Sequence, residues 1–219
     1  MFGVEFEVRG KAALFSEPVT GRDKTTYKVP TYGSLKGLCD NIYWKPSITW
    51  VIDAVRVMNS FDIGSTSVKT VKRSGGRDLM IYTFLRDVRY QIRAHIEWNN
   101  HCGYVEEDKN IGKHLPMFLK ALEVGGGRMQ PYLGVKACGC GFVDLQQCKF
   151  GEGNGAFDYT GDIDLGFMFH SFGYPASTPG GKMVARFWMP KMTDGVINFC
   201  RGEECPVVIP INARSKKSQ

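Results

Sequence analysis

The chain has 219 residues, of which 43% are hydrophobic and 23% are charged. This length suits one domain, or one domain with a smaller appendage, and this composition excludes a generally disordered chain. The formal net charge of +6 is compatible with a polyanionic partner such as RNA, although many proteins without one carry the same excess.

The first half of the chain starts with a strand pattern and continues with a helix pattern. Residues 4–9 alternate between apolar and charged side chains, which predicts a half-buried strand. After a polar loop over residues 16–30, apolar side chains recur at helical spacing, and they are Leu35, Leu38, Cys39 and Ile42. Pro46 ends this helix. Alternation over residues 48–57 slips by one position, which predicts a strand with a bulge near Asp53.

A second set of elements follows. Residues 59–78 are polar and rich in glycine and basic side chains, so we expect a loop. Residues 88–98 alternate over a long strand, with His95 on the polar face that we expect to meet solvent. A second helix is predicted from its apolar positions, which are Leu115, Phe118, Leu119 and Leu122. It ends at glycines 125–127, and a further strand is expected after Pro131.

The order strand, helix, strand, strand, helix, strand is typical of the split β-α-β arrangement, a ferredoxin-like (RRM-like) α+β fold. We assign it to residues 1–137, with both helices on one face of a four-stranded antiparallel sheet. Residues 138–213 show no helical period and several short strand patterns, with a turn at Asp194-Gly195, so they predict a small antiparallel β subdomain. Residues 214–219 form a basic tail that we expect to be disordered.

The spacing of the cysteines in the sequence does not predict a metal site. The chain has seven cysteines. Its first residues resemble no signal peptide and no apolar run could cross a bilayer, so we expect a cytoplasmic protein with reduced thiols and no membrane partner. The pairs Cys138/Cys140 and Cys200/Cys205 lack zinc-knuckle spacing and have no histidine nearby in the sequence. We therefore expect no metal and, without a nucleotide-binding loop, no cofactor.

A carboxylate group leaves one metal-dependent alternative open. Asp162 and Asp164 share a strand face, with Asp158 nearby, and such a group could hold metal ions for hydrolysis. The same residues also suit the polar flank of a turn.

RNA cleavage without metal needs a different set of residues, because the ribose 2′-hydroxyl is itself the nucleophile. A histidine, a lysine and a tyrosine can move the proton, neutralise the phosphorane and orient the hydroxyl. His114 and Lys113 open the second helix, where anions are favoured, and Tyr43 closes the first. His170 lies in an aromatic segment and is expected to be packed. A solvated helix start remains the simpler interpretation of Lys113-His114.

Short segments occur in an order that matches one known family. They include Tyr27–Thr31, Leu35–Gly37, Ile42–Pro46, Gly112–His114, Gly125–Arg128, Tyr132–Gly134 and Phe169–Pro175. Together they make the chain similar to the CRISPR-associated repeat-processing endoribonuclease of type I-C (Dvulg) systems, in the RAMP superfamily. The chain departs from the family's common Cys-Arg-Glu at residues 135–137, where it has Val-Lys-Ala.

The resemblance implies both an activity and its residues. It implies metal-independent cleavage of precursor CRISPR RNA in its repeat hairpins, followed by retention on the 5′ handle as a subunit of the type I-C interference complex. Tyr43, Lys113 and His114 take the catalytic positions, for orientation, phosphate stabilisation and proton transfer respectively. A non-catalytic subunit that binds the CRISPR RNA is the alternative.

RNA binding is expected to involve basic side chains near helix ends and loops, together with two glycines of the glycine run. These residues are Arg22, Lys24, Lys36, Lys45, Arg73, Arg77, Gly126, Gly127 and Arg128. Each basic residue could also serve solubility alone. Trp44 could stack on a base or pack in the core. The charge is also compatible with weak binding of double-stranded DNA.

Overall fold

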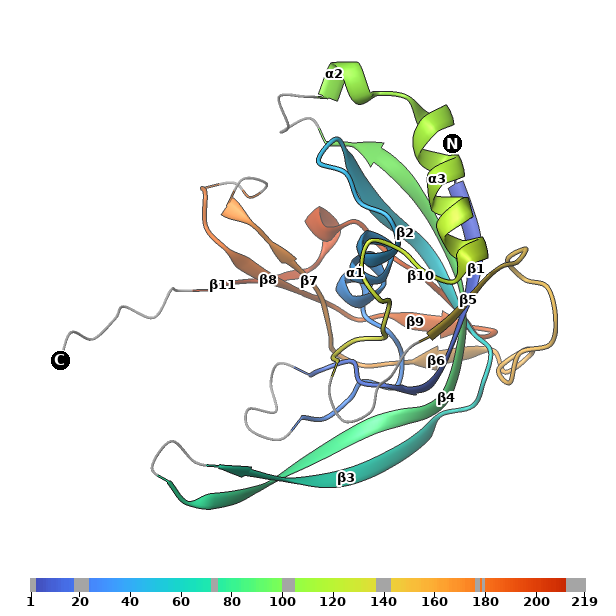
Figure 1. Cartoon of the computed structure of the whole chain (residues 1–219). Coiled ribbons are helices and arrows are strands. Elements are labelled where there is room, and N and C mark those ends of the chain that lie inside the picture. The colour runs from blue at the N-terminus through green and yellow to red at the C-terminus, as the bar shows by residue number, and fades with distance from the viewer. Residues whose placement is uncertain are drawn as a thin grey trace.

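The computed structural model describes residues 3–17, 24–71, 75–99, 105–136, 143–175, 178 and 180–211. Arg22, Arg73, His101, the Cys138/Cys140 pair and the tail 214–219 lie outside these ranges. Within them, no helix is long and apolar enough to cross a membrane. The fold is mixed α/β with antiparallel sheets (Figure 1).

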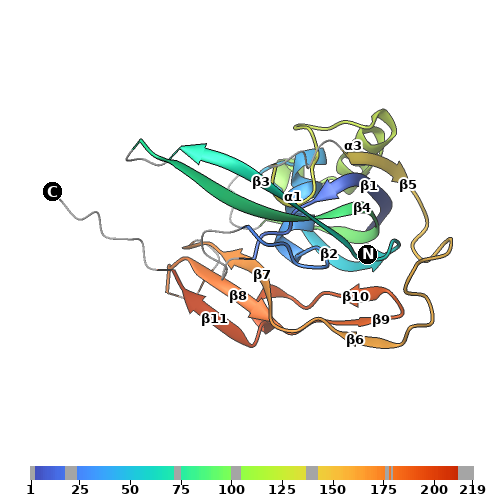
Figure 2. The ribbon, with the colours of Figure 1, turned by 90° about the horizontal axis from the view of Figure 1, so that it is seen from below.

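The strands form two antiparallel sheets. The order in the large sheet is β5 (Val143–Gln147), β1 (Gly3–Ala13), β4 (Arg77–Trp98), β2 (Ile48–Val57), β10 (Val196–Asn198), β9 (Lys191–Thr193) and β6 (Asp162–Asp164). A further strand, β3 (Asp62–Val71), pairs with β4. The small sheet has the order β11 (Val207–Pro210), β8 (Val184–Trp188) and β7 (Met168–Gly173), and it lies beside the end of the large sheet in Figure 2.

Two helices pack on the apolar face of the large sheet, as the periodicity predicts. The first is α1 (Tyr32–Ile42), which contacts β2, and the second is α3 (Ile111–Val124), which contacts β5 and α1. The Phe118 ring packs against Phe6 of β1 and Trp50 of β2, and all three side chains are buried. Burial of such side chains is the main contribution to the stability of this layer. Two short helical segments are α2 (Val105–Asp108) and η3 (Gly202–Glu204).

The prediction of a loop over residues 59–78 is wrong. The segment forms β3 and the beginning of β4, and together they make a long hairpin that projects from the body (Figure 1). Its side chains are largely exposed, including Val71 and Leu79. Only its base packs against the body, where Tyr82 and Phe84 contact Ala12 and Leu14. The rest of the ribbon is exposed and needs no apolar alternation, so its sequence carries no strand period. Asp87, with φ 44°, lies between the β3-paired and β2-paired halves of β4.

The bulge predicted near Asp53 is confirmed, since the register of β2 against β4 shifts between Ile52 and Ala54. The expectation of a solvent-facing His95 is wrong, because its side chain is buried and its Nδ1 lies 2.9 Å from the Asp53 carboxylate. The bulge places that carboxylate beside β4, where it partners the imidazole.

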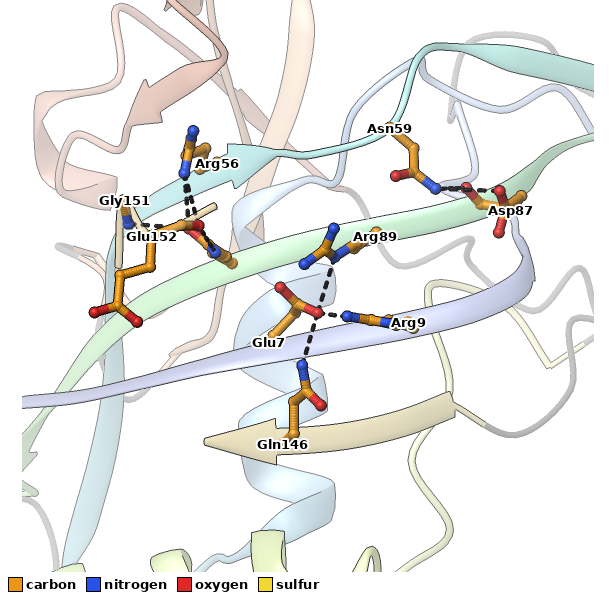
Figure 3. A network of polar contacts seen from close by, with 10 residues as sticks. Glu7, Arg9, Arg56, Asn59, Asp87, Arg89, Gln146, Gly151 and Glu152 are labelled. Carbon is orange, nitrogen blue, oxygen red and sulfur yellow. Dashed lines mark hydrogen bonds and ion pairs between the residues drawn. The ribbon is translucent and has the colours of Figure 1, made fainter. Parts of the chain in front are cut away.

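The opposite face of the large sheet carries a polar network (Figure 3). The buried Glu7 carboxylate accepts hydrogen bonds from Arg9, Arg89 and Gln146. Burial alone would raise the pKa of Glu7, but the hydrogen bonds from Arg89 and Arg9 outweigh it and hold the pKa below its usual value. Arg56 is likewise buried and pairs with both oxygens of Asp158, which ties the segment after β5 to β2.

Strands that follow residue 137 join both sheets. The short strands predicted in this region are present as β7, β8 and β10, and the turn at Asp194-Gly195 has positive φ at both residues, as a tight hairpin requires. β5 pairs with β1, and β10 pairs with β2. The large sheet therefore contains strands from both sides of residue 137. A domain boundary at that residue stays a prediction.

Candidate active site

Tyr43 is held at the carboxyl end of α1. Its backbone is extended and its N–H donates to the Cys39 carbonyl, which closes the last turn of the helix. The carbonyl of Tyr43 accepts a hydrogen bond from the Trp50 indole at 2.8 Å. These two bonds fix the backbone, so the phenol has a defined direction toward α3.

His114 lies in the first turn of α3 and meets Tyr43 there. The Tyr43 hydroxyl is 2.8 Å from His114 Nδ1, and His114 Nε2 is 2.8 Å from the backbone carbonyl of Asp108. A carbonyl can only accept, so Nε2 carries a proton. In the neutral imidazole, Nδ1 is therefore the acceptor and the Tyr43 hydroxyl is the donor. The helix packing thus joins two side chains that are 71 positions apart in the sequence.

The imidazole is more enclosed than its place at a helix start indicates. His114 is 0% exposed, so its side chain is not part of a solvated helix start. α3 begins at Ile111, and the ring lies inside the helix's first turn, with Trp98 at 5.8 Å between ring centroids. Tyr43 is 8% exposed, and burial raises the pKa of its phenol. The hydroxyl therefore stays protonated at neutral pH.

Asp108 links the remaining polar groups of the site. Its carboxylate accepts hydrogen bonds from Lys113 and Ser47, each at 2.5 Å, and lies 3.6 Å from His114 Nε2. The hydrogen bonds from Lys113 and Ser47 lower the pKa of Asp108 to about 2, and the carboxylate in turn raises the pKa of Lys113. The Lys113 side chain is 49% exposed, so it is the cation that solvent and a phosphate can reach.

Sequence reasoning missed Asp108 and Ser47. Asp108 ends a short acidic run just before α3, and Ser47 follows Pro46, which lies beyond the end of α1 at Ile42. An acidic run before a helix predicts a carboxylate near the amino end of that helix. Nothing in the sequence spacing predicts that this carboxylate contacts Ser47.

The glycine run has a structural role beside this site. Gly125 adopts a left-handed conformation, with φ 67°, and caps α3. A Cβ on Gly127 would lie 2.5 Å from the Ile42 backbone, so only glycine permits this approach to α1. The Arg128 N–H then donates to the Ile42 carbonyl at 3.1 Å, and its guanidinium lies 5.4 Å from the Trp44 ring centroid. The run thereby places an exposed cation and a half-exposed indole next to Tyr43.

The predicted RNA-binding cations that the structure describes form two groups, and Lys36 stands apart from both. Lys45 and Arg128 lie near Tyr43, in the chain or through the contacts above, and Trp44 between them is 41% exposed. Lys24 pairs with β4 on the projecting hairpin, where Arg77 also lies. Lys36 stands on α1 and forms an ion pair with Asp40 at 2.9 Å.

Two carboxylates of the metal-dependent alternative, those of Asp162 and Asp158, are bound by other protein groups. Asp162 accepts from Lys191 and Thr193, and Asp158 pairs with Arg56. The described residues do not bring these aspartates together as a metal-binding group. They form links between strands, which the sequence could not distinguish from ligands.

Comparison with known proteins identifies relatives over most of the chain. The model of the Cas5d family, described as a CRISPR-associated protein (Cas_Cas5), matches residues 3–200. A relative named CRISPR pre-crRNA endoribonuclease Cas5d, from Mannheimia succiniciproducens, is 26% identical over 227 aligned residues, which cover 89% of this chain and 93% of the relative.

Two solved structures resemble the fold. A protein of Streptococcus mutans described as functionally uncharacterized is 30% identical with a TM-score of 0.74, over 94% of this chain and 96% of that one. A crystal structure titled CRISPR-associated protein is 28% identical with a TM-score of 0.76, over 94% and 95% respectively.

Proposed function

The chain belongs to the Cas5d family of CRISPR-associated proteins, and on that premise we propose that it cleaves precursor CRISPR RNA within its repeat hairpins, without a metal ion. The observation that carries this proposal is the hydrogen bond between Tyr43 and His114 Nδ1, with the exposed Lys113 alongside. These three side chains supply a proton acceptor, an orienting hydroxyl and a cation, which is the set that 2′-hydroxyl attack requires.

Because His114 is buried, it acts through Tyr43. The RNA 2′-hydroxyl transfers its proton to the Tyr43 oxygen, while the phenolic proton of Tyr43 moves to His114 Nδ1. The freed 2′-oxygen attacks the adjacent phosphorus, the bond to the 5′-oxygen breaks, and that oxygen takes a proton from solvent. The products are a 2′,3′-cyclic phosphate and a 5′-hydroxyl. The carboxylate of Asp108, 3.6 Å from Nε2, stabilises the imidazolium that forms.

Lys113 neutralises the charge that develops on the phosphate. In the free protein its ammonium group binds Asp108, and the exposed side chain exchanges this partner for a phosphate oxygen. A cation at this position stabilises the pentacovalent transition state more than the ground state, because the charge grows during attack.

The RNA approaches along the basic groups around Tyr43. Arg128 and Lys45 contact phosphates there, and the half-exposed Trp44 stacks on an unpaired base. Arg77 on the projecting hairpin, Lys24 beside it, and Lys36 on α1 contact the RNA backbone farther along. Gly127 acts on RNA indirectly, by letting Arg128 approach α1.

A ferredoxin-like arrangement at the centre of the large sheet accompanies this function. The strand order β5-β1-β4-β2, with α1 after β1 and α3 after β4, supports it. After cleavage the protein stays on the 5′ handle in the cytoplasm as a subunit of the type I-C interference complex.

A second candidate is a CRISPR RNA-binding subunit that does not cut. The burial of His114, with both ring nitrogens already hydrogen-bonded, favours this alternative, since such an imidazole has no free edge for substrate. In that case Lys113 is a phosphate anchor alone.

A cleavage assay in excess EDTA separates the two candidates. The substrate is a labelled RNA with the repeat hairpin of the same genome, and the control RNA carries one 2′-deoxy nucleotide at the cut position. We expect one cut in the first RNA, with a 2′,3′-cyclic phosphate, and none in the control. Tight binding of the first RNA without a cut would instead establish the non-catalytic subunit. A cut that requires added Mg²⁺ would contradict the metal-free mechanism.

A further inference from the structure

A group of metal-ligating side chains lies outside the candidate active site. A ring nitrogen of His170 and the sulfur atoms of Cys200 and Cys205 all lie within 4.8 Å of one another. In the sequence, His170 is 30 positions before Cys200, so the spacing that describes zinc motifs does not reveal the group. It is the one such group in the part of the chain that the structure describes.

The three ligands come from separate elements. His170 is in β7 of the small sheet, Cys200 follows β10 of the large sheet, and Cys205 caps the η3 turn that leads to β11. The group therefore lies where the chain leaves the large sheet for the small one. We propose that His170, Cys200 and Cys205 bind a zinc ion that ties the two sheets together.

The geometry of the group needs little adjustment for zinc. Donor atoms in a tetrahedral zinc site are about 3.5–3.8 Å apart, given bonds of about 2.3 Å to sulfur and about 2.0 Å to nitrogen. The donor atoms of the group lie within 4.8 Å of one another, so they have to approach by about 1 Å to reach that spacing. The cysteines are free thiols, so both sulfur atoms are available. Water takes the fourth position on the side of Cys200, which is partly exposed, whereas His170 and Cys205 are buried.

The surroundings prepare the imidazole for a metal. Nδ1 of His170 lies 2.9 Å from the Ser171 hydroxyl, and Nε2 lies 3.1 Å from the Cys200 carbonyl. Because a carbonyl can only accept, Nε2 carries the ring proton in the metal-free chain. Zinc at Nε2 replaces this hydrogen bond, the ring proton then lies on Nδ1, and Nδ1 donates it to the Ser171 hydroxyl. Such an outer hydrogen bond orients metal-bound imidazoles. Tyr32 stacks on the ring at 4.4 Å, with Trp188 on its edge at 5.4 Å, and these contacts hold it in place.

The charge of the group also suits zinc. Two thiolates balance the charge of a divalent cation, so the bound site carries no net charge into its apolar surroundings. Thiolate and imidazole ligands select zinc over Mg²⁺ and Ca²⁺, which prefer oxygen. The group lies at the opposite end of α1 from Tyr43 and His114, so the zinc holds the two sheets together and takes no part in the RNA chemistry.

The first test measures metal on the intact protein. The chain is produced in zinc-supplemented medium, dialysed against metal-free buffer, and analysed by elemental mass spectrometry and thiol titration under native conditions. We expect one zinc per chain and a lower melting temperature after removal of zinc by a strong chelator, with recovery when zinc is added back. Substoichiometric zinc, or a disulfide between Cys200 and Cys205, would overturn the proposal.

The second test locates the metal. Replacement of zinc by Co²⁺ is expected to give thiolate-to-metal charge-transfer absorption, which weakens in Cys200→Ser and in Cys205→Ser. The matched control is Cys148→Ser, because Cys148 is a part-buried free thiol outside the group. Equal absorption in all the variants would place the metal elsewhere and contradict the assignment. If a serine variant does not fold, the zinc content and the thiol titration of the unaltered chain decide whether the metal site exists.

Discussion

Helix α1 has a tyrosine next to a histidine at each end, and the two ends differ in every other respect. At the amino end the Tyr32 ring stacks on His170, with ring planes 15° apart. At the carboxyl end the Tyr43 hydroxyl points at His114 Nδ1. The helix has 11 residues, so its two ends are about 16 Å apart.

The surroundings decide what each pair can do. His170 is enclosed by aromatic rings and thiols, and burial lowers its pKa to about 4, so it stays neutral and can serve as a ligand. His114 is just as buried, but its tyrosine partner, Lys113 and Asp108 connect it to solvent. The Tyr32–His170 pair thus suits a structural contact, whereas the Tyr43–His114 pair suits proton transfer. The reason is that only the second pair has polar groups that connect it to solvent.

The largest expected effect comes from His114→Ala. Loss of the proton acceptor should reduce the single-turnover cleavage rate about 10²–10⁴-fold, while RNA affinity is retained. His114→Gln, which keeps hydrogen-bonding atoms but takes up no proton, should show a similar loss. Circular dichroism checks that both variants are folded. A wild-type cleavage rate in a folded variant would refute the role of His114 as proton acceptor.

Lys113→Ala is expected to reduce the cleavage rate about 10²–10³-fold, because the growing charge on the phosphate loses its cation. Lys113→Arg should recover part of the rate. The control is Lys120→Ala, an exposed lysine on the same helix. An equal effect of the two alanine variants would indicate general charge attraction in place of a specific contact.

Tyr43→Phe sharpens the comparison, because Tyr32→Phe is its matched change at the other end of the helix. Loss of the Tyr43 hydroxyl removes the connection through which His114 acts, so we expect cleavage to slow about 10²–10⁴-fold, as in His114→Ala. Tyr32→Phe should leave the rate unchanged in the same single-turnover assay. If both variants cleave equally well, the hydroxyl of Tyr43 transfers no proton.

Gly127→Ala tests how the carboxyl end of α1 is assembled. The added methyl group meets the Ile42 backbone, so the free energy of unfolding should fall by about 1–3 kcal/mol. Gly126→Ala is the control, because among the described residues no atom lies within 4 Å of its Cβ position. Urea denaturation measures both, and equal stabilities would contradict the close approach.

The smallest expected effect is a pH dependence of stability at Asp108. Its pKa in the folded chain is about 2, below the ordinary value of 3.8, so its ionised form stabilises the fold above about pH 4. That contribution is lost as the pH falls toward 2. The melting temperature of Asp108→Asn should therefore lie below that of the parent at pH 5, and the gap should close between pH 4 and pH 2. A gap independent of pH would show that the charge of Asp108 is not involved.

The sequence by itself determined the elements that have a buried face. Apolar periodicity located α1 and α3, the bulge at Asp53 and the short strands near the carboxyl end, because burial requires that spacing. It also indicated Tyr43 and His114 as residues at facing helix ends. The projecting hairpin was not predicted, because most of it is exposed and needs no apolar period.

Tertiary structure alone decided which distant polar groups meet. It placed Asp108 and Ser47 at Lys113, buried His95 against Asp53, and brought His170 to Cys200 and Cys205. Each contact joins separate elements, and its partners depend on how helices and sheets pack. A local sequence pattern predicts which side of one helix or strand is buried. The distance between side chains on different elements depends instead on how all the elements pack around the core.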